Sequence, residues 1–140
     1  MRGCNMKGRL VIEVFDKNGK LKQKKELTNY TFNENKTDFV KTGVSKITQI
    51  GIGLDNTAGS PDDTPTLKNI LREENCVNEQ EGDYTVKSWH TFTYFDATYD
   101  IWEIGLKLSN GKYLTRAVLD EAVTVDPDNN IKVTYYFTVE

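Results

Sequence analysis

The chain has 140 residues, of which 37% are hydrophobic and 28% are charged, and its formal net charge is -3. This length supports one hydrophobic core, and the interspersed charges lack the basic patch that is typical of nucleic-acid binding. We therefore expect one domain over residues 1–140, with residues 1–6 flexible, and no nucleic-acid partner.

The N-terminal region and the cysteines indicate where the chain is made. The first residues lack the apolar segment of a secretory signal, and either Met1 or Met6 fits as the natural start. Apolar runs are much shorter than the roughly 20 residues that a membrane-spanning helix needs. Cys4 and Cys76 are too few for a disulfide framework, so we expect free thiols, a reducing cytoplasm and no membrane association.

The first predicted element is a β-hairpin. Residues 10–15 are rich in β-branched and aromatic side chains, and the Asn18-Gly19 pair after them favours a tight turn. The second arm, up to residue 27, carries many lysines, as edge strands do. Residues 29–42 break the alternation and predict a short helix or an ordered loop.

A central strand and a long loop follow. Residues 47–54 place three aliphatic side chains on one face, and two glycines there permit close approach of another segment. Residues 55–65 are rich in Asn, Gly, Ser, Asp and Pro, which predicts the longest loop. We expect a short strand or helical turn over residues 67–74 and a polar turn over residues 78–83.

The clearest strand patterns lie in the second half of the chain. Residues 84–95 alternate with aromatic side chains on both faces, so a second sheet or a neighbouring subunit must cover one of them, and we favour the subunit. Residues 101–108 and 113–119 flank an Asn-Gly turn, and residues 131–139 form the last strand. The fold class is all-β: an antiparallel sandwich, jelly-roll-like, or a small barrel, with at most one short helix.

Few side chains could support catalysis or metal binding. The single histidine, His90, lies in the middle of a strand, where a hydrogen bond to a neighbour accounts for it without a functional role. The aspartates of residues 55–63 and 126–128 match no calcium loop, and turn hydrogen bonds explain them. We therefore predict no enzyme, no catalytic residue, no metal and no cofactor.

Aromatic side chains offer a functional alternative. Exposed rings such as Trp89, Tyr99 or Trp102 could bind sugars or anchor a protein interface, although core packing explains most aromatic residues of the chain. Solvent exposure distinguishes these interpretations, because a sugar site needs at least one flat ring open to water.

Residues 101–106 (IWEIGL) and 110–119 (NGKYLTRAVL) resemble small β-sandwich virion proteins of tailed bacteriophages. In those proteins a similar strand precedes a glycine turn and an R-A-V-L strand. Residues 47–53, the loop after them, Leu67 and Arg72 look like an earlier segment of the same family. The similarity spans roughly residues 47–139.

The resemblance implies a virion protein that is made in the host cytoplasm and binds other virion proteins. A trimeric capsid decoration (cement) protein that stabilises the phage head is the first expectation, because the chain is short and has no shaft-like repeat. A tail, baseplate or fibre module is the alternative, and a carbohydrate-binding domain is the alternative of another class. The partner is then the major capsid protein or a tail protein.

Two positions in the resembling segment have a physical explanation. Gly105 permits close approach within a strand, and Arg116, among apolar neighbours, requires a carboxylate such as Glu103 across the hairpin. The structural or interface candidates are Trp89, Tyr99, Trp102, Glu103, Gly105 and Arg116.

Overall fold

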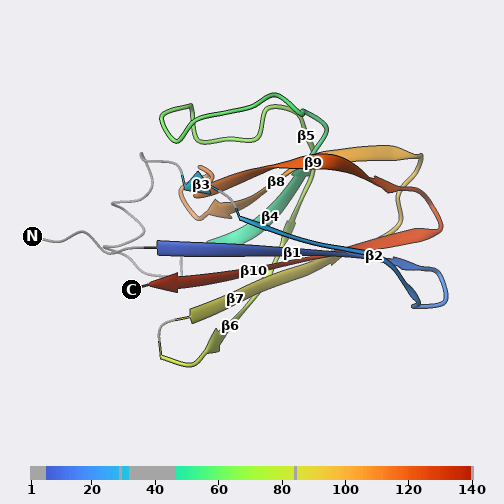
Figure 1. Ribbon diagram of the computed structural model, residues 1–140, viewed down its shortest axis with the longest axis horizontal. Coiled ribbons are helices and arrows are strands. Elements are labelled where there is room, and N and C mark those ends of the chain that lie inside the picture. The colour runs from blue at the N-terminus through green and yellow to red at the C-terminus, as the bar shows by residue number, and fades with distance from the viewer. Residues whose placement is uncertain (1–5, 29, 32–46, 84, 140) are drawn as a thin grey trace, which may run out of the picture.

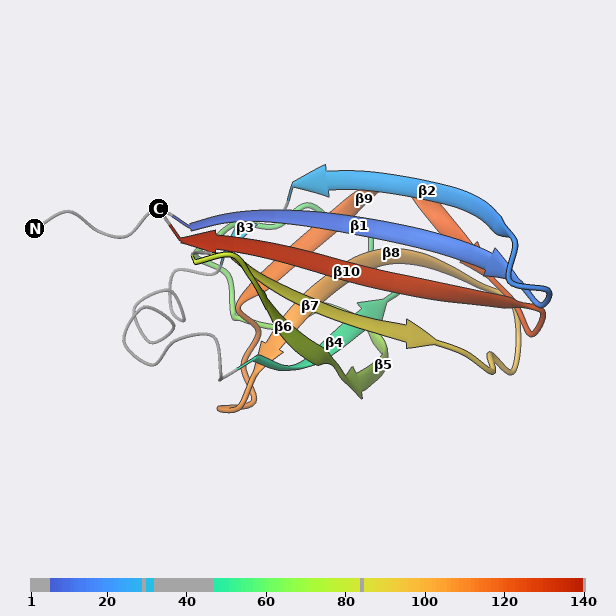
Figure 2. The same cartoon turned by 90° about the horizontal axis from the view of Figure 1, so that it is seen from below.

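The chain folds as an antiparallel β-sandwich, seen in a computed structural model that describes residues 6–28, 30–31, 47–83 and 85–139. Ten strands within these ranges form two five-stranded sheets, without a helix or a closed barrel in the described part of the chain. Figures 1 and 2 show the two layers from two directions. The predicted sandwich is therefore confirmed.

The first sheet contains both ends of the described chain. Its strands, in spatial order, are β2 (Leu21–Thr28), β1 (Met6–Asp16), β10 (Asn129–Val139), β7 (Thr85–Phe92) and β6 (Val77–Glu81). The predicted hairpin is confirmed as β1 and β2, with Gly19 at a φ of 81° in the turn, and β2 is an edge strand. β1 and β10 lie side by side along their whole length (Figure 2).

The second sheet contains the predicted central strand and the two strands on either side of the Asn110-Gly111 turn. Its order is β3 (Tyr30–Thr31), β9 (Thr115–Val125), β8 (Tyr99–Leu108), β4 (Ile47–Gly53) and β5 (Ile70–Asn75). The predicted central strand is confirmed, because β4 pairs with β5 on one side and with β8 on the other. The predicted turn before β9 is also confirmed, with Gly111 at a φ of 84°.

One hydrophobic core fills the space between the sheets. It contains Leu10 and Ile12 of β1, Ile50 of β4 and Ile104 of β8, all fully buried. Tyr135 of β10 donates its hydroxyl hydrogen to the backbone oxygen of Ile104 at 3.2 Å, which joins the two layers inside the core. Burial of these apolar side chains is the main stabilising contribution to the fold.

Polar contacts close both sides of the sandwich. Lys25 of β2 donates to Asp120 of β9 at 3.1 Å on one side. On the other side Asn78 of β6 donates its amide hydrogen to the backbone oxygen of Ile47 in β4 at 2.8 Å.

Two local predictions are wrong. Much of the predicted polar turn over residues 78–83 belongs to β6, because main-chain pairing with β7 tolerates a fully exposed, polar edge strand. The strand predicted to reach residue 95 ends at Phe92, because Tyr94 adopts a φ of 60°. In β8 the pairing register shifts between Ile101 and Glu103, and Ile101 is fully buried.

Other predictions lie partly outside the described residues. Of the segment predicted as a helix or ordered loop, residues 29–42, only Tyr30–Thr31 is described, and it forms β3. Residues 1–5, including Cys4, also lie outside the described ranges.

Candidate functional site

The loop between β4 and β5, residues 54–69, lies against the outer face of the second sheet (the green segment of Figure 1). Loops of more than about 12–15 residues without secondary structure are uncommon in small domains and are frequently functional. The contacts below it show how this loop is fixed.

Two glycines make room for an aromatic ring under the loop. Gly51 of β4 and Gly105 of β8 are directly paired, and the Tyr113 side chain lies over both. A Cβ atom on Gly51 would overlap the Tyr113 hydroxyl, and one on Gly105 would lie 2.6 Å from Tyr113 Cδ2. Leu67 of the loop packs on Tyr113, and the two buried side chains form a second, small core.

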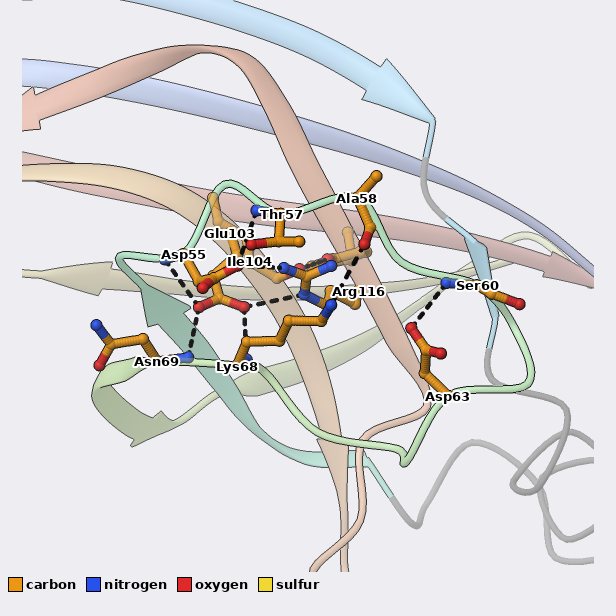
Figure 3. Close-up of polar contacts among 11 residues, drawn as sticks. Asp55, Thr57, Ala58, Ser60, Asp63, Lys68, Asn69, Glu103, Ile104 and Arg116 are labelled. Atoms are coloured by element: carbon orange, nitrogen blue, oxygen red, sulfur yellow. Dashed lines mark hydrogen bonds and ion pairs between the residues drawn. The ribbon is translucent and has the colours of Figure 1, made fainter.

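The Glu103 carboxylate holds the two ends of the loop. This side chain is fully buried in β8, and each of its two carboxylate oxygens accepts two hydrogen bonds (Figure 3). Oε1 accepts the backbone N–H of Lys68 at 2.8 Å and Nε–H of Arg116 at 2.9 Å. Oε2 accepts the backbone N–H groups of Asn69 at 2.8 Å and Asp55 at 3.1 Å.

Arg116 of β9 completes this arrangement, and the predicted pairing of Arg116 with Glu103 is confirmed. Its guanidinium is almost completely buried and also reaches Asp55 Oδ1 at 3.5 Å. Hydrogen bonds from Thr57, together with the positive charge of Arg116, lower the pKa of the Asp55 carboxyl. We call the contacts of Glu103 and Arg116 with the loop the Glu103 clamp.

Tyr113 connects the clamp region to a second acidic group. Its hydroxyl donates to Glu73 Oε2 of β5 at 2.7 Å, and Lys107 Nζ lies 3.0 Å from the same oxygen. Partial burial opposes ionisation of Glu73, but these two donors outweigh it and lower the pKa of Glu73. Burial and the neighbouring Glu73 raise the pKa of Tyr113, which therefore remains a hydrogen-bond donor.

The clamp presents a loop whose outer surface is polar and exposed. Within it, Asp63 accepts the Ser60 N–H at 2.9 Å and Asp55 accepts the Thr57 N–H at 2.8 Å, which confirms the turn interpretation of these aspartates. A loop fixed before binding loses less conformational entropy when it contacts a partner. The arrangement is chemically suited to recognition.

A hollow of about 450 Å³ lies beside β5 and the segment that joins β7 to β8. It is lined by Leu71, Arg72, Tyr94, Phe95, Asp96 and Tyr99. Tyr94 is 92% exposed, by far the most exposed large hydrophobic side chain among the described residues.

A charged network adjoins this hollow. Glu74 accepts a hydrogen bond from Arg72 Nε at 2.6 Å, and His90 Nε2 lies 2.7 Å from the other Glu74 oxygen. His90 also packs edge-on against Phe92. These contacts are those of a half-buried strand histidine, as the sequence predicts, and they connect β5 to β7.

The structure separates the six sequence candidates into four places. Glu103, Gly105 and Arg116 meet under the loop, whereas Tyr99 lines the hollow. Trp89 lies half-buried on the outer face of the first sheet, with Lys132 Nζ 5.0 Å from its ring centre. Trp102 is half-buried at the shift in β8.

Sequence reasoning missed several members of these sites. The backbone N–H groups of Asp55, Lys68 and Asn69 carry no sequence signal, because every residue except proline has one. Tyr113 and the paired glycines could have been connected, since glycines within neighbouring strands indicate close approach of another group. Tyr94 was placed in a regular strand, and its positive φ was not foreseen.

No cluster of three or more potential metal ligands and no helix long enough to span a membrane occur among the described residues. Burial raises the pKa of the free Cys76 thiol to about 11, which disfavours the reactive thiolate.

Comparison of the chain with protein-family models, curated proteins and solved structures finds no match.

Proposed function

We propose that the chain is a non-enzymatic structural protein of a bacteriophage virion that binds a neighbouring virion protein through residues 55–69. The observation that carries this proposal is the Glu103 clamp, which fixes a long polar loop on a rigid sheet. Rigid loops on β-sandwiches are a common way to present a binding surface.

The position of the family-like residues supports the same proposal. The segments that resemble virion proteins are separated in the chain, but five of their residues meet under one loop: Gly51, Leu67, Glu103, Gly105 and Arg116. Arg72, by contrast, lies at the hollow. Most of the resembling pattern therefore corresponds to the parts that fix the loop. Capsid decoration, as a trimer, is the form that we propose first, and a tail, baseplate or fibre module is the alternative.

A matched pair of substitutions tests the role of the loop. Ala58 is exposed in the loop, and Ala97 is exposed in the segment between β7 and β8. Ala58→Arg adds a bulky charge to the loop without touching Glu103 or Arg116, so we expect it to abolish binding to phage particles that lack the protein. Ala97→Arg makes the same change elsewhere and is expected to leave particle binding intact.

Light scattering and co-sedimentation provide the measurements. A trimer that coats empty heads supports decoration, and a chain that joins only tail or fibre fractions moves the assignment to the tail. If Ala58→Arg still binds heads or tail fractions as well as the unmodified chain does, the role of the loop is contradicted. If the unmodified chain binds no particle fraction, the proposed function is contradicted.

A further inference from the structure

Tyr94 has an exposed ring on a strained backbone. Its side chain is 92% exposed, whereas Leu21, the next most exposed large hydrophobic among the described residues, is 45% exposed. Its φ of 60° lies in the left-handed region, which is strained for a residue other than glycine. Strain of this kind is concentrated at functional sites.

The neighbouring residue keeps Tyr94 in this position. Phe95 is buried, and the Arg72 guanidinium lies 4.8 Å from the centre of its ring. Arg72 is fixed in turn by a 2.7 Å hydrogen bond from Nη1 to the backbone oxygen of Thr93. The chain around Tyr94 is therefore anchored on both sides, and the Tyr94 ring extends into water.

The hollow beside Tyr94 combines an apolar floor with hydrogen-bonding groups. Half-buried Leu71 provides apolar surface, and Tyr99 donates its hydroxyl hydrogen to Asp96 Oδ1 at 2.6 Å. This hydrogen bond raises the pKa of Tyr99 and orients the exposed Asp96 carboxylate.

From this geometry we infer that the hollow binds a saccharide, with Tyr94 stacked on the apolar face of a sugar ring. Asp96 and Tyr99 then form hydrogen bonds with the hydroxyl groups of the sugar. A large protein interface fits less well, because stable interfaces bury about 800 Å² on each partner around an apolar centre. Here one open ring is bordered by polar groups. The inference is independent of particle binding through residues 55–69.

Ligand-observed saturation-transfer NMR with the full chain tests this inference. The probes are maltohexaose, cellohexaose, chitohexaose, mannohexaose and solubilised peptidoglycan fragments, each at millimolar concentration. We expect saturation transfer to at least one of them. Tyr94→Asn removes the ring and is expected to weaken that binding by about tenfold or more.

The same variants separate binding from folding. Asparagine tolerates positive φ, so Tyr94→Asn is expected to leave the melting temperature unchanged or raised. Tyr94→Phe keeps the ring and retains most of the affinity, whereas Asp96→Asn weakens it. Leu21→Asn, which removes an exposed apolar side chain from β2, is the control and leaves saccharide binding unchanged.

Two results overturn the inference. One is the absence of saturation transfer to every probe. The other is equal affinity of the unmodified chain and Tyr94→Asn for the saccharide that binds. If Tyr94→Asn reduces particle binding while no saccharide binds, the hollow is a protein contact and the inference also fails.

Discussion

The outer faces of the two sheets are covered in different ways. On the second sheet, the paired glycines Gly51 and Gly105 leave space for Tyr113, and the loop of residues 54–69 lies above them. On the first sheet, no described loop takes that position. There the half-buried rings of Tyr136 and Trp89 lie beside the positively charged side chains of Arg9 and Lys132. Figure 1 shows the loop of residues 54–69 over the second sheet.

The comparison teaches that the position of an ion pair determines its effect. Arg116 and Glu103 are both buried below the loop, whereas Arg9 and Glu26 form a 2.9 Å pair on the first sheet with side chains about half exposed. Exposed pairs contribute little because water screens them, but removing one partner of a buried pair leaves an uncompensated charge. The following substitutions measure this difference.

Arg116→Ala is expected to give the largest effect. It leaves the fully buried Glu103 carboxylate without its cation, which should lower the free energy of unfolding by about 3–5 kcal/mol. Urea denaturation monitored by tryptophan fluorescence measures the change. A loss below about 1 kcal/mol would mean that the loop N–H groups alone stabilise Glu103.

Gly51→Ala is expected to destabilise the fold by roughly 1–3 kcal/mol, because the new methyl group overlaps the Tyr113 side chain. In a double-mutant cycle, Tyr113→Ala combined with Gly51→Ala should cost less than the sum of the two single substitutions. Thermal unfolding of the four proteins provides the data. Strict additivity would contradict a direct contact between these two positions.

Tyr113→Phe removes a hydrogen bond to Glu73 and is expected to cost about 1 kcal/mol at neutral pH. The folded-state pKa of Glu73 lies below its ordinary value of 4.5, so ionised Glu73 contributes stability above pH 4.5. That contribution is lost as the pH falls below 4.5 and through the lowered pKa. The variant should lose less stability over this acid range, and an unchanged pH profile would argue against the role of Tyr113.

Arg9→Ala is expected to change the free energy of unfolding by less than about 1 kcal/mol, because its pair with Glu26 is exposed on the first sheet. Its effect should shrink further in high salt. This variant is the matched control for Arg116→Ala in the same denaturation experiment. An equal loss in both variants would remove the distinction between the two faces.

The sequence was informative where side chains determine structure. The Asn18-Gly19 and Asn110-Gly111 pairs located two turns, and Arg116 pointed to Glu103 because a charge among apolar neighbours needs a partner. β6 was missed because a polar edge strand is stabilised by main-chain pairing with β7, which leaves no alternation of apolar side chains.

The candidate sites were less predictable because they depend on the backbone. The Arg116–Glu103 pair of the clamp was predictable from the sequence. The loop residues Lys68 and Asn69, however, contribute backbone N–H groups whose position depends on the folded loop. Tyr94 continued an aromatic alternation in the sequence, and only tertiary anchoring of Phe95 explains why its ring faces water.

Amide hydrogen exchange tests most directly whether the Glu103 clamp fixes the loop. In the unmodified chain, the amides of Asp55, Lys68 and Asn69 should be protected as strongly as amides in β8. Glu103→Gln keeps the side-chain shape but removes its negative charge, so protection of these three amides should fall while β1 and β10 remain protected. Rapid exchange of the three amides in the unmodified chain would contradict the clamp.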